Sequence, residues 1–205
     1  MYICFEWTVG TGKTTQSKIL HDYLQKKYPD REVIRVREPG KTPIAEAIRT
    51  LVQWTPFDEE MDPLCEAYLY TAARAQLINT VIKPVLAKWW IVISDRCFRS
   101  SLSYQWYAKW LSIDKVRQVN APIVGDCLPD HVLFFDMPVD IGLSRTFDSA
   151  GDKHELNGKD FFLKAHEGYL ACIKDGRFAK HAHSIDALGS IEEVTARVIH
   201  ILAKV

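Results

Sequence analysis

The stretch Gly10-Thr11-Gly12-Lys13-Thr14-Thr15 brings turn-forming glycines, a cation and hydroxyl groups into one short segment. Glycines allow backbone N–H groups to curl around an anion, and the dipole of a helix that begins here adds to the attraction. The Lys13 ammonium can bridge the β- and γ-phosphates of a nucleoside triphosphate, and the Thr14 hydroxyl can bind Mg²⁺. The pattern predicts a phosphate-binding loop for MgATP; the alternative is a glycine-rich turn with a capping threonine.

The opening of this loop departs from the full pattern, G-x-x-x-x-G-K-[ST]. The first glycine of that pattern falls at position 7, where the sequence has Trp7. A Cβ atom and an indole at the start of a tight turn hinder closure of the loop around a phosphate. The motif is therefore intact from Gly10 onward and altered at its first position.

The segments around the loop are those that a phosphate loop requires. Residues 1–6 form a short apolar run, and apolar residues then recur at helical spacing from Ile19 to Leu24. Residues 32–36 have the pattern of a second strand. Strand, glycine turn, helix and strand in this order predict a right-handed parallel βαβ unit.

Strands and helices alternate along the rest of the chain. Helical patterns cover residues 42–53, 64–86 (interrupted at Pro84) and 191–203, and strands are expected at 91–93, 132–135 and near 183–186. This alternation predicts an α/β fold, a doubly wound parallel sheet of about five strands with helices on both faces and ligands at the carboxyl ends of the strands. A chain of 205 residues without repeat or linker is expected to form one domain, residues 1–205.

Composition narrows the classes of partner and compartment. Lys and Arg number 26, and so do Asp and Glu, so neither nucleic acid nor an anionic membrane is expected as a partner. The five cysteines lack a C-x-x-C pair, which argues against a disulfide framework or a zinc site, and the seven histidines show no ligand spacing. Without a leader pattern or an apolar run of ~20 residues, a cytoplasmic protein with no membrane segment is expected.

Further segments, in order and at suitable distances, give the chain a resemblance to the thymidylate kinase family. They are Arg37-Glu38-Pro39-Gly40, residues 69–76 (LYTAARAQ), Asp95-Arg96 and residues 100–105 (SSLSYQ), followed by Pro129-Asp130, residues 142–145 (GLSR) and residues 168–170 (GYL). The resemblance covers nearly the whole chain, and the ordered set is far more specific than a phosphate loop alone. It implies a nucleoside-monophosphate kinase that transfers a phosphoryl group from MgATP to dTMP.

The resemblance assigns a role to each residue of the candidate site. Arg37, Arg74 and Arg96 bind the monophosphate, for which guanidinium groups are well suited because they donate bidentately and stay charged. By the same resemblance, Tyr70 stacks on thymine, Ser101 and Gln105 contact the base edge, Tyr104 crowds the 2′ position of the sugar, and Asp95 supports Mg²⁺. Arg145 lies against adenine by this resemblance, with a plain helix-surface position as the equal alternative. Lys13, Arg96 and Asp95 are the expected catalytic residues.

The family also implies parts outside the nucleotide contacts. A small lid is expected at about residues 146–158, which would exclude water from the reacting groups. A homodimer is expected, and the apolar, aromatic-rich residues 64–77 suit its interface, with ordinary core packing as the alternative.

Three departures from the family bear on activity. Val9 replaces the Asp or Glu that family members usually carry in the loop, and Lys41 replaces the second glycine after Pro39. The expected lid (TFDSAGDKHE at 146–155) holds only Lys153, with Arg145 beside it, as cations to stabilise the transferring group. Cations in that place contribute ~10³-fold or more in rate.

A fourth departure is a pattern, because four tryptophans stand where the family usually has glycine: Trp7, Trp89, Trp106 and Trp110. Random drift would rarely convert four turn-type glycines into the bulkiest residue. We hypothesise that the source of the gene reads one codon, TGA, as glycine, whereas this translation reads it as tryptophan.

Three functions are consistent with these patterns. The leading hypothesis is an active thymidylate kinase. A kinase for another deoxynucleoside monophosphate is the alternative within the enzyme class, because Tyr70 and Val9 leave base and sugar selectivity open. A nucleotide-binding homologue with impaired catalysis is favoured by Val9, Trp7 and the cation-poor lid, and is opposed by the retention of Lys13, Arg74 and Arg96.

Overall fold

A computed structural model of the protein describes residues 1–54, 58–109, 111–125, 127–146, 158–175 and 180–203. Its centre is a five-stranded parallel sheet with the strand order β2-β3-β1-β4-β5. The strands are β1 (Tyr2–Glu6), β2 (Val33–Arg37), β3 (Ile91–Asp95), β4 (His131–Asp136) and β5 (His181–Asp186). The expected doubly wound α/β fold is confirmed.

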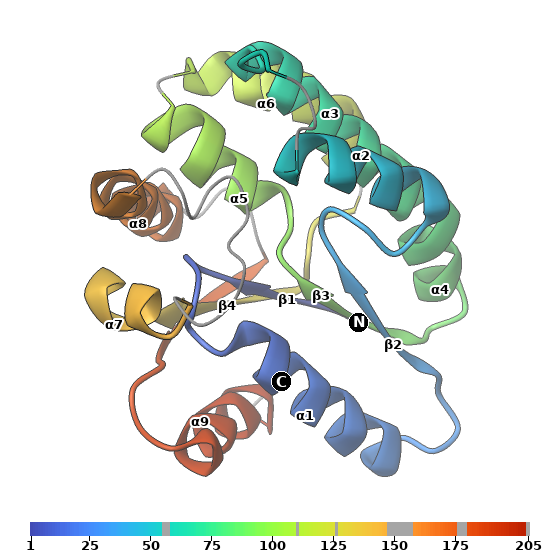
Figure 1. Cartoon of the computed structure of the whole chain (residues 1–205). Helices are drawn as coiled ribbons and strands as arrows, with labels where there is room; N and C mark the ends of the chain where they lie inside the picture. Colours follow the sequence, from blue (N-terminus) through green and yellow to red (C-terminus); the bar gives the residue numbers. More distant parts are fainter. Residues whose placement is uncertain (55–57, 110, 126, 147–157, 176–179, 204–205) are drawn as a thin grey trace.

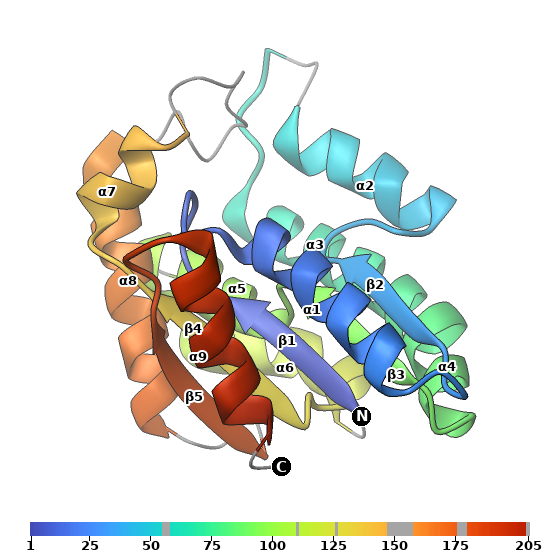
Figure 2. The same cartoon turned by 90° about the horizontal axis from the view of Figure 1, so that it is seen from below.

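Helices cover both faces of the sheet, as Figures 1 and 2 show. On one face lie α1 (Lys13–Lys27) and α9 (Ile191–Ala203), which pack against each other. The other face and the sheet margins carry α2 (Pro43–Gln53), α3 (Pro63–Leu77), η1 (Ile78–Ile82), α4 (Lys83–Ala87), α5 (Phe98–Ser101), η2 (Leu102–Ala108), α6 (Ile113–Val124), α7 (Val139–Ser144) and α8 (Gly158–Asp175). The sheet is thus sandwiched between two helical layers.

The central strands are apolar because both of their faces are covered. Every residue of β1 is buried, and its neighbours β3 and β4 are buried except at their last positions. Buried parallel strands read as continuous apolar runs instead of alternating ones. The polar residues Asp95 and Asp136 close β3 and β4, so the carboxyl edge of the sheet is where charged groups gather.

Local signals start the helices that frame the site. The Thr42 side chain accepts a hydrogen bond from Ala45 N (3.2 Å) at the start of α2, and Asp62 accepts from Leu64 N (2.8 Å) and Cys65 N (3.0 Å) at the start of α3. A proline follows each cap, in the position where its missing N–H costs nothing. The interruption lies before the expected position: the π-helical segment η1 covers Ile78–Ile82, and Pro84 is in the first turn of α4.

Candidate active site

The phosphate loop connects β1 to α1 and depends on close contact with α7. Gly10 has φ +71°, and a Cβ atom at this position would lie 1.8 Å from the carbonyl oxygen of Gly142. Gly12, directly before α1, has φ +84°. Both torsions belong to the left-handed region that side chains disfavour, so glycine is required here by conformation and, at Gly10, also by space.

Lys13 begins α1 and points back into the loop. Its ammonium donates to the carbonyl oxygen of Thr8 and to the Thr11 hydroxyl, and the side chain is buried. Burial, together with the positive charge of Arg96, lowers the pKa of Lys13 to about 7, although Asp95 opposes the shift. The ammonium is therefore held where a phosphate would complete its environment, and it lacks a carboxylate hydrogen-bond partner among the described residues.

Thr14 and Asp95 meet at the mouth of the loop. The Thr14 hydroxyl donates to a carboxylate oxygen of Asp95 across 2.6 Å, so the first turn of α1 touches the end of β3. A hydroxyl and a carboxylate are hard oxygen ligands of the kind that Mg²⁺ selects, and Mg²⁺ uses few protein ligands when it also binds phosphates. This pair fits the magnesium site expected from the sequence.

Arg96 follows Asp95 in a left-handed backbone conformation, with φ +76°. Its Nη1 donates to the carbonyl oxygen of Trp7 (2.8 Å), the Ser100 hydroxyl (3.2 Å) and the Tyr169 hydroxyl (3.1 Å). Burial acts to lower the pKa of Arg96, but the surrounding Tyr104, Tyr169, Asp95 and Glu6 raise it well above its ordinary value. Arg96 is thus a fixed cation next to the phosphate loop.

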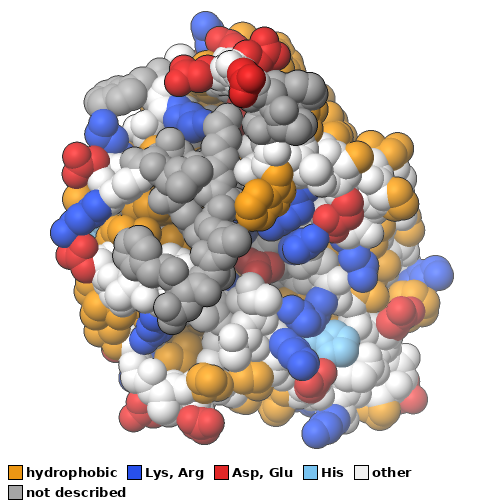
Figure 3. Space-filling view, viewed as in Figure 1, with side chains coloured by type: hydrophobic (Ala, Val, Ile, Leu, Met, Phe, Trp, Pro, Cys, Tyr) orange, Lys and Arg blue, Asp and Glu red, His pale blue; other side chains and the backbone are white. Residues whose placement is uncertain are grey.

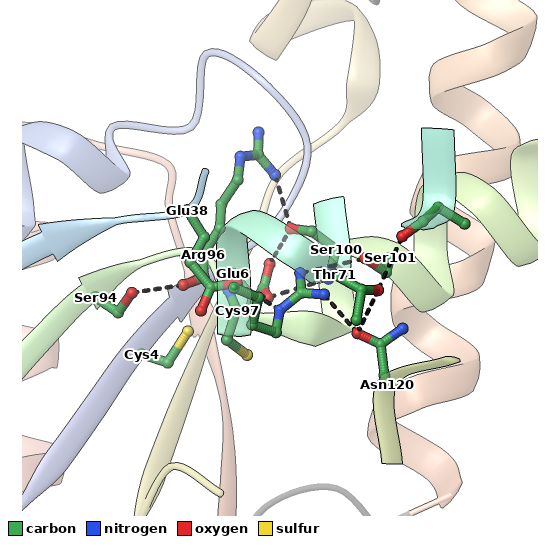
Figure 4. A network of polar contacts seen from close by, with 12 residues as sticks. Cys4, Glu6, Glu38, Thr71, Ser94, Arg96, Cys97, Ser100, Ser101 and Asn120 are labelled. Carbon is green, nitrogen blue, oxygen red and sulfur yellow. Dashed lines mark hydrogen bonds and ion pairs between the residues drawn. The ribbon is translucent and has the colours of Figure 1, made fainter. Parts of the chain in front are cut away.

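Arg74, on α3, lies in a buried polar network, part of which Figure 4 shows. Its Nε donates to Glu38 (2.7 Å), Nη1 to the Asn120 side-chain oxygen (2.5 Å) and Nη2 to the Ser101 hydroxyl (3.2 Å). Burial raises the pKa of Glu38, against the opposing effect of Arg74. These contacts fix the guanidinium in one orientation.

Two cavities adjoin at Arg96. The larger, of about 590 Å³, is lined by loop and strand-end residues that include Lys13, Thr14, Arg37, Asp95 and Arg96. The smaller, of about 60 Å³, is lined by residues of α3, α5 and η2 together with the segment after β2: Tyr70, Arg74, Ser101, Tyr104 and Gln105, with Glu38 and Pro39. Val9, Glu38, Gln53 and Arg96 line both. Figure 3 shows Lys and Arg side chains gathered on the same face of the molecule.

The side chains expected around a base therefore do surround one pocket. Tyr70 is partly exposed into it, whereas Ser101, Tyr104 and Gln105 are buried. Gln105 Nε2 donates to Glu66 (2.8 Å), whose other oxygen accepts from Lys109 (2.6 Å). This hydrogen bond orients the Gln105 amide, because its NH₂ group donates to Glu66.

Two of the predicted site residues are exposed and do not line the smaller cavity. Arg37, at the end of β2, is exposed, pairs with Glu46 (2.8 Å) and lines only the larger cavity. Arg145 is exposed at the end of α7 and is absent from the described lining of either cavity. Thr11 and Thr15 stay in the loop and the first turn of α1, and the expected lid lies outside the described residues except at 146 and 158.

The residues at the positions where the family usually has glycine differ in exposure and in backbone conformation. Trp89 is 81% exposed with φ +61°, and Lys41 has φ +75°, so both occupy backbone that favours glycine. Trp7 is fully buried and stacks on Tyr169, with ring centroids 5.4 Å apart. Trp106 is partly buried in η2, and Trp110 lies outside the described residues.

Sequence reasoning missed three residues that shape the site. Glu38 was visible in the motif after β2 but received no role, although it is the ion-pair partner of Arg74. Glu6 accepts from the backbone N–H groups of Cys97 (2.8 Å) and Ser100 (3.1 Å) and so holds the segment after β3. Gln53, at the end of α2, lines both cavities, and no local pattern distinguishes it.

A glycine loop between a parallel strand and a helix, with a buried lysine and a Thr–Asp pair at its mouth, defines a P-loop nucleotide-binding protein. The family model for thymidylate kinase matches residues 5–198. The chain belongs to the thymidylate kinase family.

Individual relatives agree with this assignment over the full length. The chain is 38% identical to a thymidylate kinase of Finegoldia magna over 206 residues, which cover 100% of this chain and 98% of the relative. It is 36% identical to a thymidylate kinase of Kosmotoga olearia over 97% of this chain and 93% of the relative. The crystal structure of thymidylate kinase from Ehrlichia chaffeensis superposes with a TM-score of 0.80 at 28% identity, covering 98% of each chain. Among the described helices, none has the length and apolar character that a membrane span needs.

Proposed function

We propose that this protein phosphorylates dTMP to dTDP with MgATP as the donor. The observation that carries the proposal is the junction of two cavities at Arg96: a cation-lined cleft at the phosphate loop and a small pocket closed by Tyr70, Tyr104 and Gln105. A donor triphosphate in the first and a nucleoside monophosphate in the second would meet at one guanidinium. The family assignment supports the same reaction.

In this proposal the residues act by position and charge. Lys13 and the N–H groups between Gly10 and Thr15 bind the donor phosphates, while Arg96 contacts both the transferring and the accepting group. Arg74 fixes the acceptor phosphate, and Arg37 adds a second cation at the rim of the cleft. Phosphoryl transfer needs in-line positioning and charge stabilisation more than covalent chemistry, and fixed cations beside a buried loop supply both.

Mg²⁺ is proposed as the metal, held by the Thr14 hydroxyl and Asp95 together with donor phosphate oxygens. When bound, it neutralises charge on the β- and γ-phosphates. Asp95 and Thr14 already touch, so the protein side of this site is formed before nucleotide binds.

Selectivity for thymine and deoxyribose is proposed to come from the small pocket. Tyr70 offers an aromatic face, Gln105 and Ser101 offer polar contacts to a base edge, and the buried Tyr104 ring leaves little room beside the sugar. Arg145 is assigned to adenine, as the family resemblance implies.

The remaining expectations are proposals of the same kind. We treat residues 1–205 as one cytoplasmic domain with a lid near 146–158. A homodimer through α3 is supported by Tyr68, which is 56% exposed on that helix.

The decisive experiment measures ADP formation from MgATP with and without dTMP, with dUMP and dCMP as competing acceptors. We expect turnover that depends on dTMP and is lost in Arg96→Ala. Turnover with dUMP or dCMP in preference to dTMP would favour the alternative of a kinase for another deoxynucleoside monophosphate. ATP binding without turnover on any acceptor would favour the impaired homologue.

A further inference from the structure

Four residues line both cavities and so mark the place where the cavities adjoin, here called the waist: Val9, Glu38, Gln53 and Arg96. The Val9 side chain is apolar and offers no hydrogen bond. Arg96 is assigned to the phosphates, and Glu38 pairs through Oε2 with Arg74. Gln53 is the polar residue of the waist to which the proposed reaction gives no part.

The side chain of Gln53 is buried and its oxygen has no partner. Gln53 is 8% exposed, and its Oε1 atom accepts no hydrogen bond from the described residues. Buried side-chain oxygens in folded proteins are nearly always paired, because an unpaired oxygen has lost water without gaining a replacement. Glu38 Oε1 is likewise buried and without a partner in the described part of the chain. The waist therefore presents acceptor oxygens that suit a hydrogen-bond donor from a ligand.

The backbone around Gln53 holds it at the waist. Gln53 is the last residue of α2, directly after the fully buried Val52. One turn earlier, Arg49 Nη1 donates to the carbonyl oxygen of Pro39 (3.0 Å), which ties this end of the helix to the segment that carries Glu38. Residues four apart in a helix lie on the same face, so Gln53 is directed toward that segment as Arg49 is.

The part of the ligand that reaches the waist follows from the proposed function, on which this inference rests. The monophosphate lies at Arg96, and the base lies in the smaller cavity beside Tyr70 and Gln105. The sugar joins the two, so it lies at the waist. A deoxynucleoside 5′-monophosphate has one free sugar hydroxyl, the 3′-hydroxyl, which can donate one hydrogen bond. The N3–H group of thymine belongs to the base edge, to which Ser101 and Gln105 are already assigned.

We propose that Gln53 determines which sugar the acceptor site takes: its Oε1 atom accepts a hydrogen bond from the 3′-hydroxyl, with Glu38 Oε1 as a second acceptor at the same waist. A site built to pair with a hydroxyl rejects an analogue that lacks it, because the buried oxygen then stays unpaired. Gln53 thus makes the site selective for nucleotides with a 3′-hydroxyl and is a binding residue without a part in the chemical step.

The test compares the affinity for dTMP with that for 3′-deoxythymidine 5′-monophosphate, which lacks only the 3′-hydroxyl, by calorimetry in the absence of ATP. The variant is Gln53→Met, which keeps an unbranched side chain of the same length but has no amide. The control is Gln118→Met, at an exposed position of α6 outside the described lining of both cavities. We expect the wild type and the control to bind dTMP about tenfold more tightly than the 3′-deoxy compound. In Gln53→Met this preference should fall to about threefold or less.

Thermal melting of the same proteins separates binding from a structural role. Gln53→Met should melt no lower than the wild type, because the oxygen that it removes has no partner in the free protein. A lower melting temperature would show that the amide supports the fold and would overturn the proposal. An unchanged preference for dTMP in Gln53→Met, or an equal loss of affinity for both nucleotides, would overturn it too.

Turnover with MgATP distinguishes a failure of this inference from a failure of the proposed kinase activity. If dTMP is phosphorylated and Gln53→Met keeps the wild-type preference, the kinase stands and the contact with the 3′-hydroxyl is wrong. If the preference falls in Gln53→Met but the wild type does not phosphorylate dTMP, the contact stands and the kinase activity is wrong. Failure of the wild type to bind dTMP would contradict both.

Discussion

The Arg74 Nε and Glu38 Oε2 atoms lie 2.7 Å apart, with both side chains less than 5% exposed. This ion pair connects α3 to the segment after β2 and sets the direction of a guanidinium that lines the smaller cavity. Removing one partner of a buried pair leaves an uncompensated charge and costs about 3–5 kcal/mol. We expect Glu38→Gln to lower the free energy of unfolding by about this amount and to raise KM for dTMP more than KM for ATP.

Urea unfolding and initial-rate kinetics check this prediction. The matched control is Asp140→Asn, which breaks the exposed Lys159–Asp140 pair (2.7 Å) and should change stability by no more than about 1 kcal/mol. A Glu38→Gln protein with wild-type stability and wild-type KM for dTMP would show that the pair does not position Arg74.

Lys13 gives a prediction about protons. Its pKa of about 7 in the free protein means that the ammonium is mostly deprotonated at pH 8. A bound phosphate stabilises the charged form and raises the pKa, so we expect MgATP binding at pH 8 to take up close to one proton, and uptake to shrink as the pH falls below 7. Calorimetry in buffers of different ionisation enthalpy measures this uptake. Lys13→Met should abolish it, and wild-type binding at pH 8 without proton uptake would contradict the prediction.

The same shift predicts how stability depends on pH. The folded-state pKa of Lys13 lies below its ordinary value of 10.5, so between about pH 7 and pH 10 the unfolded chain binds more protons at this residue than the folded one. The Lys13 contribution to the free energy of unfolding therefore rises with pH across that window. Lys13→Met should flatten this part of the stability profile, measured by urea unfolding at intervals of pH.

The framework was predictable from the sequence, but several side-chain relationships were not. The strand–loop–helix order and the place of Asp95 and Arg96 at the end of a strand follow from local apolar runs, whereas the roles of these two residues came from the family resemblance. The Arg74–Glu38 pair joins residues far apart in the chain, and the stacking of His131 on His181 depends on which strands become neighbours. The strand order β2-β3-β1-β4-β5 decides the second relationship, the packing of α3 beside the segment after β2 decides the first, and no local pattern encodes either. Arg145 was likewise assigned by resemblance, and its exposed position just after α7 leaves that role a prediction.

The contact between the Thr14 hydroxyl and Asp95 (2.6 Å) predicts how activity depends on Mg²⁺. Thr14→Val keeps the shape of the side chain but removes the oxygen ligand, so we expect the half-saturating Mg²⁺ concentration to rise about tenfold or more. Thr14→Ser retains the hydroxyl and should stay near the wild type. The measurement is turnover against free Mg²⁺ at saturating nucleotides, and chelation by EDTA should abolish turnover. Equal Mg²⁺ dependence in Thr14→Val and wild type would remove Thr14 from the metal site.

Trp89 gives a stability prediction because its backbone has φ +61° while 81% of the residue is exposed. A left-handed residue with a side chain costs roughly 1–2 kcal/mol relative to glycine, and little buried area is lost on removing this indole. We expect Trp89→Gly to stabilise the protein by about 1 kcal/mol. Trp54→Gly is the control, since Trp54 is 52% exposed but has φ −127° and should gain nothing. A Trp89→Gly protein that melts no higher than the wild type would show that the left-handed backbone at Trp89 does not destabilise the protein.

The four tryptophans at expected glycine positions lead to a prediction about the gene. Trp89 occupies glycine backbone, whereas Trp7 is fully buried beside Tyr169 with an Nε1 that has no hydrogen-bond partner among the described residues. A buried donor left unpaired destabilises the folded protein by about 1–3 kcal/mol, and the opening of a phosphate loop is an unusual place for such a group. We expect TGA at codons 7, 89, 106 and 110, read as glycine in the source, and TGG at codons 54 and 90. TGG at all six would establish every tryptophan as genuine.

The protein with glycine at the four positions should be assayed beside the protein that carries the four tryptophans. The carbonyl oxygen of residue 7, which accepts a hydrogen bond from Arg96, is present in both proteins. A gain in dTMP-dependent turnover would therefore be due to removal of the tryptophan side chains.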